Sequence, residues 1–105
     1  MEFCRYKKII TPIKEVDYRL DGIDNKYLIN EGKRSLGVFA ATKGVVVPTQ
    51  IAAGEICFYI LEGSLEILND DKTFLLKAGD MLLIPHSCTY SLNFVENAKA
   101  IAIRM

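Results

Sequence analysis

The chain has few of the residues that metal and redox chemistry usually need. It contains one histidine, His86, among 105 residues, and its three cysteines, Cys4, Cys57 and Cys88, include no C-x-x-C pair. Three thiols cannot all pair with each other, and Cys57 lies in an apolar run, where a reduced cysteine behaves as a small hydrophobic residue. We therefore expect free thiols and a reducing compartment.

An excess of charge and a long hydrophobic run are also missing. Thirteen basic residues balance thirteen acidic ones, so the formal net charge is +0 at pH 7. Nucleic-acid binding needs a surplus of basic groups on some face of the protein. The apolar runs fall far short of the roughly 20 residues that span a bilayer, and the N-terminus lacks a secretion signal. We expect a cytoplasmic protein that binds neither nucleic acid nor membrane.

What the chain does contain is a series of short apolar segments with a period of two residues. Turn-forming glycine, proline, asparagine and aspartate residues separate them, which is typical of an all-β sandwich or barrel. At this length one domain is expected, with residues 1–30 as an N-terminal arm or edge strands and 31–105 as the barrel. The predicted strands are 35–41, 44–48, 55–61, 64–68, 73–76, 80–84, 90–94 and 98–103.

The stretch GEICFYILEGSLEILNDDKTFLLKAGDMLLIPHSCTYSLNF carries a more specific signal. It resembles the core of the cupin superfamily, whose members combine the motifs G-x5-H-x-H-x3/4-E-x6-G and G-x5-P-x-G-x2-H-x3-N. Gly44, Gly63, Gly79 and Pro85 match the framework positions, and the resemblance covers residues 36–104. It implies an all-β fold, an antiparallel jelly-roll (cupin) barrel.

The metal-ligand positions of that pattern hold other residues. Alignment on the glycines places Gln50 and Ala52 at the two histidines of the first motif, Ile56 at its glutamate and Tyr90 at the histidine of the second. Transition metals need several imidazole, carboxylate or thiolate donors converging on one point. Alanine and isoleucine donate nothing, an amide oxygen is a weak ligand, and a phenol would have to ionise. We therefore expect no metal and no cofactor.

Two other residues are candidates for chemistry. His86 follows Pro85 at a variable position of the pattern, so we interpret it as a histidine at the barrel rim, with contact to a ligand at the pocket mouth and metal ligation as the alternatives. Glu55 precedes the glutamate position by one residue, which turns its side chain to the opposite face of the strand. A bulge near Gly54 would be needed to bring it inward.

The positions that would hold the metal still lie at the centre of the expected barrel. They predict a mostly apolar cavity with two hydrogen-bonding groups, Gln50 and Tyr90, as is common in small-molecule pockets. The competing interpretation is that these side chains fill the barrel as an ordinary core. The candidate ligand-binding residues are Gln50, Ala52, Ile56, Phe58, Ile60, Met81, Leu83, Tyr90, Leu92 and Phe94.

Three functions remain open. We favour a metal-free barrel that binds a small, largely apolar molecule or a sugar-like metabolite as a sensor or accessory module, which the resemblance allows. The first alternative is a metal-independent isomerase or epimerase with Tyr90 as its acid. The second is a degenerate barrel that acts only as a dimerisation or interaction unit.

The outer face of the strand at residues 55–61 is apolar as well. Cys57, Tyr59 and Leu61 alternate with the inward Ile56, Phe58 and Ile60, although a strand buried on one face only would carry polar residues there. Something must cover this face. The resemblance implies a homodimer that packs sheet on sheet, and the alternative cover is the chain's own residues 1–30.

Overall fold

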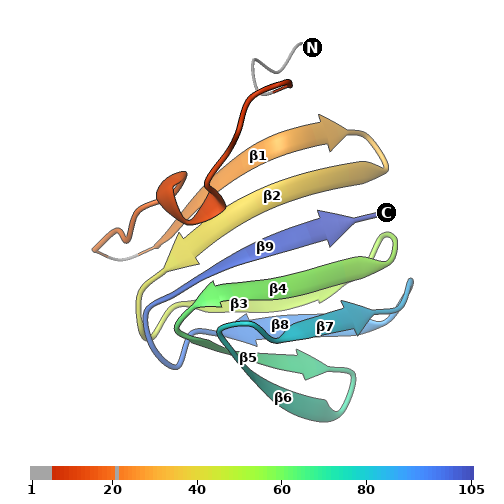
Figure 1. Cartoon of the computed structure of the whole chain (residues 1–105). Coiled ribbons are helices and arrows are strands. Elements are labelled where there is room, and N and C mark those ends of the chain that lie inside the picture. Colours follow the sequence, from red (N-terminus) through yellow and green to blue (C-terminus); the bar gives the residue numbers. More distant parts are fainter. Residues whose placement is uncertain (1–5, 21) are drawn as a thin grey trace.

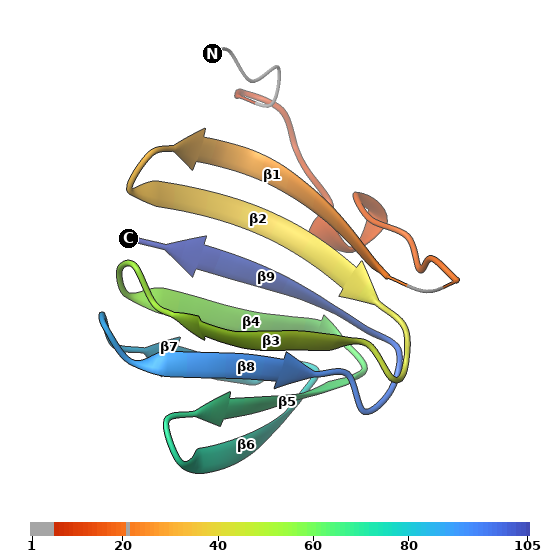
Figure 2. The same ribbon diagram turned by 180° about the vertical axis from the view of Figure 1, so that it is seen from behind.

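The computed structural model describes residues 6–20 and 22–105, and within them the chain forms nine strands in two antiparallel sheets (Figures 1 and 2). One sheet has five strands in the order β1-β2-β9-β4-β7, and the other has four in the order β3-β8-β5-β6. This arrangement confirms the predicted jelly-roll fold. The strands are β1 (Ile23–Glu31), β2 (Arg34–Ala41), β3 (Val46–Ile51), β4 (Ile56–Glu62), β5 (Ser64–Asn69), β6 (Lys72–Lys77), β7 (Met81–Ile84), β8 (Thr89–Asn93) and β9 (Ala98–Arg104).

Each of the eight predicted segments overlaps one of the strands β2 to β9. Strand β1 lies in the region expected as an arm or edge strands, and it forms the edge of the five-stranded sheet beside β2. The described residues contain one short helical element, the 3-10 turn η1 (Pro12–Lys14). Within them no helix is long and apolar enough to cross a membrane. Cys57 and Cys88 are free thiols, whereas Cys4 lies outside the described residues.

The main core lies between the two sheets. Alternation along each strand sends every second side chain inward, so both sheets contribute. Burying one such aliphatic or aromatic side chain stabilises the fold by roughly 1.5–3 kcal/mol. The largest side chains that are fully buried between the sheets are Phe94, Ile60, Leu65, Ile67 and Ile84.

The N-terminal segment covers part of the outer face of the five-stranded sheet (Figure 1). Val16 is 1% exposed and packs among Leu28, Val38 and Ala40, which point away from the main core. Leu61 on β4 packs against the same cluster. The alternative in which the chain's own arm covers the outer face therefore holds for this part of the sheet.

Polar contacts fix the same segment in place. The Tyr18 hydroxyl donates a hydrogen bond to the Glu62 carboxylate, and burial together with this bond raises the pKa of Tyr18. The Lys99 ammonium donates to the carbonyl oxygen of Ile13 at 2.8 Å and lies 5.2 Å from the centre of the Tyr18 ring. A lysine over an aromatic face is attracted by the ring quadrupole. These contacts tie residues 13–18 to β4 and β9.

The predicted inward position of Met81 and Leu83 is wrong. In the β4–β7 ladder Met81 pairs with Tyr59 and Leu83 with Cys57, so both share the outer face with those residues. They are 59% and 62% exposed. Since the segment MLLI is apolar throughout, its sequence gave no sign of which residues face inward; Leu82 and Ile84 are the inward pair.

Gly63, in the turn that connects β4 of one sheet with β5 of the other, lies in close contact with the backbone of Asn97. Gly63 has φ 77°, and a Cβ there would lie 2.0 Å from the carbonyl oxygen of Asn97. Gly79 has a similar φ of 92° but nothing within 4 Å of its Cβ position. We expect Gly79→Ala to cost about 1–2 kcal/mol for the left-handed backbone alone. Gly63→Ala should lose at least about 3 kcal/mol more, because the backbone must move.

Urea unfolding of the two variants measures this difference directly. Equal losses in the two proteins would show that the contact between Gly63 and Asn97 does not constrain the turn.

Candidate functional site

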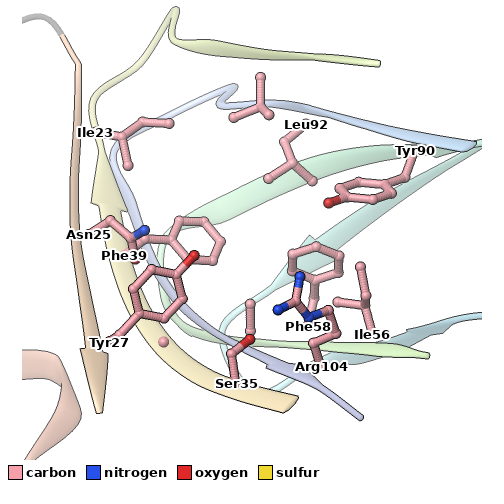
Figure 3. A pocket seen from close by; sticks show the side chains of 13 residues that line it. Ile23, Asn25, Tyr27, Ser35, Phe39, Ile56, Phe58, Tyr90, Leu92 and Arg104 are labelled. Carbon is pink, nitrogen blue, oxygen red and sulfur yellow. The ribbon is translucent and has the colours of Figure 1, made fainter. Parts of the chain in front are cut away.

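A cavity of about 250 Å³ opens between the two sheets on the side where β1 and β2 lie (Figure 3). Its walls come from β1, β2, β4 and β9 of the five-stranded sheet and from β3 and β8 of the other. The lining residues are Ile23, Asn25, Tyr27, Ser35, Gly37, Phe39, Val47, Ile56, Phe58, Tyr90, Leu92, Ala102 and Arg104.

Aromatic rings separate this cavity from the packed core. Phe39 meets the edge of Phe94 on one side, with ring centres 6.0 Å apart at 83°, and Phe58 on another, at 6.4 Å and 87°. Phe58 in turn lies 5.8 Å from Tyr90. Edge-to-face pairs of this kind hold aromatic side chains in defined orientations. The barrel is therefore filled around Phe94 and hollow beyond Phe39 and Phe58.

Two of the four positions aligned with metal ligands contact each other. Gln50 on β3 and Tyr90 on β8 are ladder partners, and the Tyr90 hydroxyl donates to the Gln50 side-chain oxygen at 3.0 Å. Burial raises the pKa of Tyr90, and the nearby Arg104 opposes that shift. Tyr90 is therefore a neutral phenol at pH 7.

The other two positions aligned with metal ligands, Ala52 and Ile56, do not contact this pair in the same way and differ from each other. Ile56 is 5% exposed and lines the cavity, whereas Ala52 is 1% exposed and belongs to the packed core. Ala52 therefore does not lie where a pocket ligand would reach it. Its backbone joins the β7–β8 turn instead, accepting from the Ser87 N–H and donating to the Cys88 carbonyl, each at 2.9 Å.

This donor set does not fit a metal ion. An amide, a methyl group, a branched alkyl chain and a phenol with a raised pKa supply no imidazole or carboxylate where the family pattern has its ligands. Nor do any three histidine, cysteine, aspartate or glutamate side chains in the described part of the chain converge on one point.

The remaining predicted residues divide between cavity and core. Phe58 and Leu92 line the cavity. Ile60 and Phe94 are each 0% exposed and belong to the packed core, while Met81 and Leu83 lie on the outer face. Gln50 is exposed and reaches the site through its bond to Tyr90.

His86 and Glu55 lie outside the cavity. His86 is exposed on the turn between β7 and β8, where its Nδ1 atom is 3.4 Å from the Ser87 hydroxyl. Glu55 is exposed just before β4, and no bulge turns it inward.

The sequence did not predict the polar residues that the five-stranded sheet contributes to the cavity. Arg104 has the same inward direction as Ala98, Ala100 and Ala102 on β9, because all four positions alternate along AKAIAIR. That alternation was visible in the sequence. The position of Arg104 beside Ser35 was not visible there, because only the β2–β9 ladder brings these two residues together.

Tyr27 reaches the cavity because Gly37 lies opposite it on β2. A Cβ at Gly37 would come within 3.3 Å of the Tyr27 ring, so the missing side chain leaves the space over which that ring lies. The pairing of an aromatic residue with a cross-strand glycine is a known way of stabilising a sheet. Tyr27 and its strand neighbour Asn25 lay in the segment interpreted as an arm or edge strand.

Comparison with known proteins agrees with this fold. A family model described as ethanolamine utilisation protein EutQ matches residues 22–104. A conserved protein of unknown function from Streptococcus pyogenes superposes with a TM-score of 0.92 at 21% identity, covering 100% of this chain and 95% of that one. A cupin superfamily protein from Desulfitobacterium hafniense gives 0.87 at 18% identity, covering 94% and 91% of the two chains.

A putative ethanolamine utilization protein Q from Salmonella typhimurium superposes with a TM-score of 0.69 at 16% identity, covering 78% of this chain and 68% of that one. None of the curated proteins matches the sequence. At these identities the solved structures establish the fold alone.

The donor chemistry of the site predicts how the protein behaves toward metals. Purified without a polyhistidine tag, it should carry well below one equivalent of any transition metal by elemental analysis. Added zinc or iron should leave the melting temperature unchanged, because only binding to the folded state would raise it. If the protein instead carries stoichiometric metal that is lost in Glu55→Ala, then a bulge in the segment just before β4 turns Glu55 inward in solution.

Proposed function

This chain belongs to the EutQ family within the cupin superfamily, and we propose that its barrel binds a small, largely apolar molecule without a metal. The observation that supports the proposal is the cavity beyond Phe39 and Phe58. Its walls are mainly aliphatic and aromatic, with a few polar groups, which is the composition of small-molecule sites. A barrel kept only as an interaction unit would have no need of such a space.

The size of the cavity limits the ligand. Pockets for drug-sized molecules measure roughly 300–1,000 Å³, and this one measures about 250 Å³. A molecule with one ring or a short chain fits that volume. The apolar walls favour such a body over a sugar, whose many hydroxyl groups would need many partners.

Catalysis by an acid–base pair has less support than binding. The thirteen lining residues include no aspartate, glutamate or histidine. Tyr90 has a raised pKa and already donates its hydroxyl proton to Gln50. An isomerase needs a base and an acid on opposed sides of its substrate. We therefore propose a sensor or accessory role rather than turnover.

We also propose that a second copy of the chain covers the rest of the outer sheet face. The arm packs over Val38 and Leu61, but it leaves Met81 and Leu83 exposed on the same face. Contiguous exposed apolar surface usually marks an interaction site. Across β2, β9, β4 and β7 this face carries Leu36, Ile103, Cys57 and Leu83 in one row and Tyr59 and Met81 in the next. Met81 and Leu83 are its exposed members, Leu36, Ile103 and Tyr59 are half-buried, and Cys57 is buried.

Two alanines on β9 provide a matched test of the pocket. Ala102 lines the cavity, whereas Ala100, two residues away on the same face, is 0% exposed in the core. Ala102→Leu should fill the space, change stability by less than about 1.5 kcal/mol and abolish ligand binding, while Ala100→Leu should destabilise by about 1–3 kcal/mol through overpacking.

Urea unfolding gives the two stabilities, and a thermal-shift screen of small metabolites gives binding to the wild type. The pocket proposal fails when Ala102→Leu loses as much stability as Ala100→Leu and the wild type shows no hit.

Assembly has its own matched pair of variants. Leu83 is 62% exposed on the proposed interface, and Leu75 on β6 of the other sheet is 54% exposed. We expect light scattering to show a dimer for the wild type at micromolar concentration. Leu83→Lys should give a monomer, because it places a charge in an apolar contact, and Leu75→Lys should remain dimeric. A monomeric wild type would contradict the proposal.

A further inference from the structure

Arg104 is the one charged residue among the thirteen that line the cavity. It lies between Ser35 of β2 and Ile56 of β4, its partners in the two ladders that β9 makes. Its Nη2 atom donates to the carbonyl oxygen of Gly32, in the β1–β2 turn, at 2.7 Å. This bond orients the guanidinium at the cavity wall.

The guanidinium has few other partners. Its Nε atom is buried and has no hydrogen-bond acceptor. None of the ion pairs among the described residues includes Arg104, and the cavity walls contain no acidic side chain. A buried donor without an acceptor and a half-buried charge without a counter-charge are both costly, and native proteins rarely keep them without a reason.

Neutral hydrogen-bonding groups also face the cavity, from both sheets. Tyr27, Tyr90 and Arg104 point into the space from three different strands (Figure 3). The Tyr90 hydroxyl donates to Gln50, but the side chains of Tyr27 and Ser35 make no hydrogen bond within the described part of the chain. Tyr27 and Ser35 therefore keep unused donors on the same sheet as Arg104, and Phe39, Phe58 and Leu92 supply the apolar surface of the cavity.

We infer that the occupant is a small organic monocarboxylate, with its carboxylate held by Arg104 and its apolar body against Phe39 and Phe58. This inference rests on the proposed binding function and adds the chemical class of the ligand. A planar guanidinium matches a carboxylate in geometry and gives charge-assisted hydrogen bonds. The carboxylate also supplies the counter-charge that the protein lacks at this point.

A phosphate fits the site less well. Phosphoryl groups carry more charge and more acceptor oxygens, and proteins usually meet them with several cations or with a cluster of backbone N–H groups. Here a single arginine is present, and the rest of the lining is neutral. One positive charge beside an apolar space corresponds to one negative charge on an apolar body.

Benzoate, benzamide and phenyl phosphate test this inference on the full-length protein. Benzoate and benzamide have similar size and differ in charge, and calorimetry should show benzoate binding at least about tenfold tighter, as expected for a hydrogen bond to a charged group. Phenyl phosphate should bind more weakly than benzoate. Because this comparison uses the wild type, it does not depend on whether any variant folds.

Arg104→Gln assigns the preference to the side chain. It should reduce benzoate affinity to the level of benzamide and leave benzamide affinity unchanged. Arg34→Gln is the matched control, since Arg34 is exposed on β2 and paired with Glu31 outside the cavity; it should alter neither affinity.

The possible failures are distinguishable. Equal binding of benzoate and benzamide, or tighter binding of phenyl phosphate, overturns the carboxylate inference and leaves the proposed pocket in place. A preference for benzoate that survives Arg104→Gln in folded protein overturns the role of Arg104. No binding of any of the three compounds also overturns the inference, and the metabolite screen with Ala102→Leu then decides separately whether the pocket binds anything.

Discussion

The cavity depends on one cross-strand row in which a glycine and an alanine are too small to reach the side chains of the opposite sheet. Strand β9 lies between β2 and β4, and its Ala102 pairs with Gly37 on one side and Phe58 on the other. One row earlier Phe39 flanks Ala100, and its ring closes off the packed core. Since an interior without voids is the norm, the glycine and alanine of this row leave a space toward the opposite sheet, and the rings of Tyr27 and Phe58 border it. Polar residues lie at the edge of that space.

The neutral residues at the metal-ligand positions and the unpaired arginine together determine the electrostatics of the cavity. In the cupin pattern a cation at the barrel centre would be surrounded by histidines and a glutamate. Here Ile56 and Tyr90 make that region neutral, and the positive charge of Arg104 lies at the cavity wall on β9. An arginine keeps its charge at every physiological pH. The site therefore offers a fixed cation that needs no metal, and its selectivity would depend on charge and shape rather than on coordination chemistry.

The sequence predicted the fold better than the site, for physical reasons. Period-two alternation identified eight of the strands, because burial of one face imposes it directly. It failed at Met81 and Leu83, where both faces of β7 are apolar and hydrophobicity gives no direction. Arg104 and Tyr27 were also left out. Alternation along β9 gives the inward direction of Arg104, but its place at the cavity, like that of Tyr27, depends on ladder pairing with β2. Residues that line a pocket because of sheet order leave no local signature, whereas residues aligned with a known motif, such as Gln50 and Tyr90, do.

The two faces of β9 connect the pocket with the proposed assembly. Ala102 and Arg104 point into the cavity, and Ile103 between them points to the outer face, where it lies beside Cys57. A partner packed on Ile103 would hold the backbone segment that positions both pocket residues. Displacing that segment outward would widen the space at Ala102 and carry the guanidinium away from the Gly32 carbonyl, which now orients it. In the proposed dimer, the contact at Ile103 and the two pocket residues would therefore share one segment of β9.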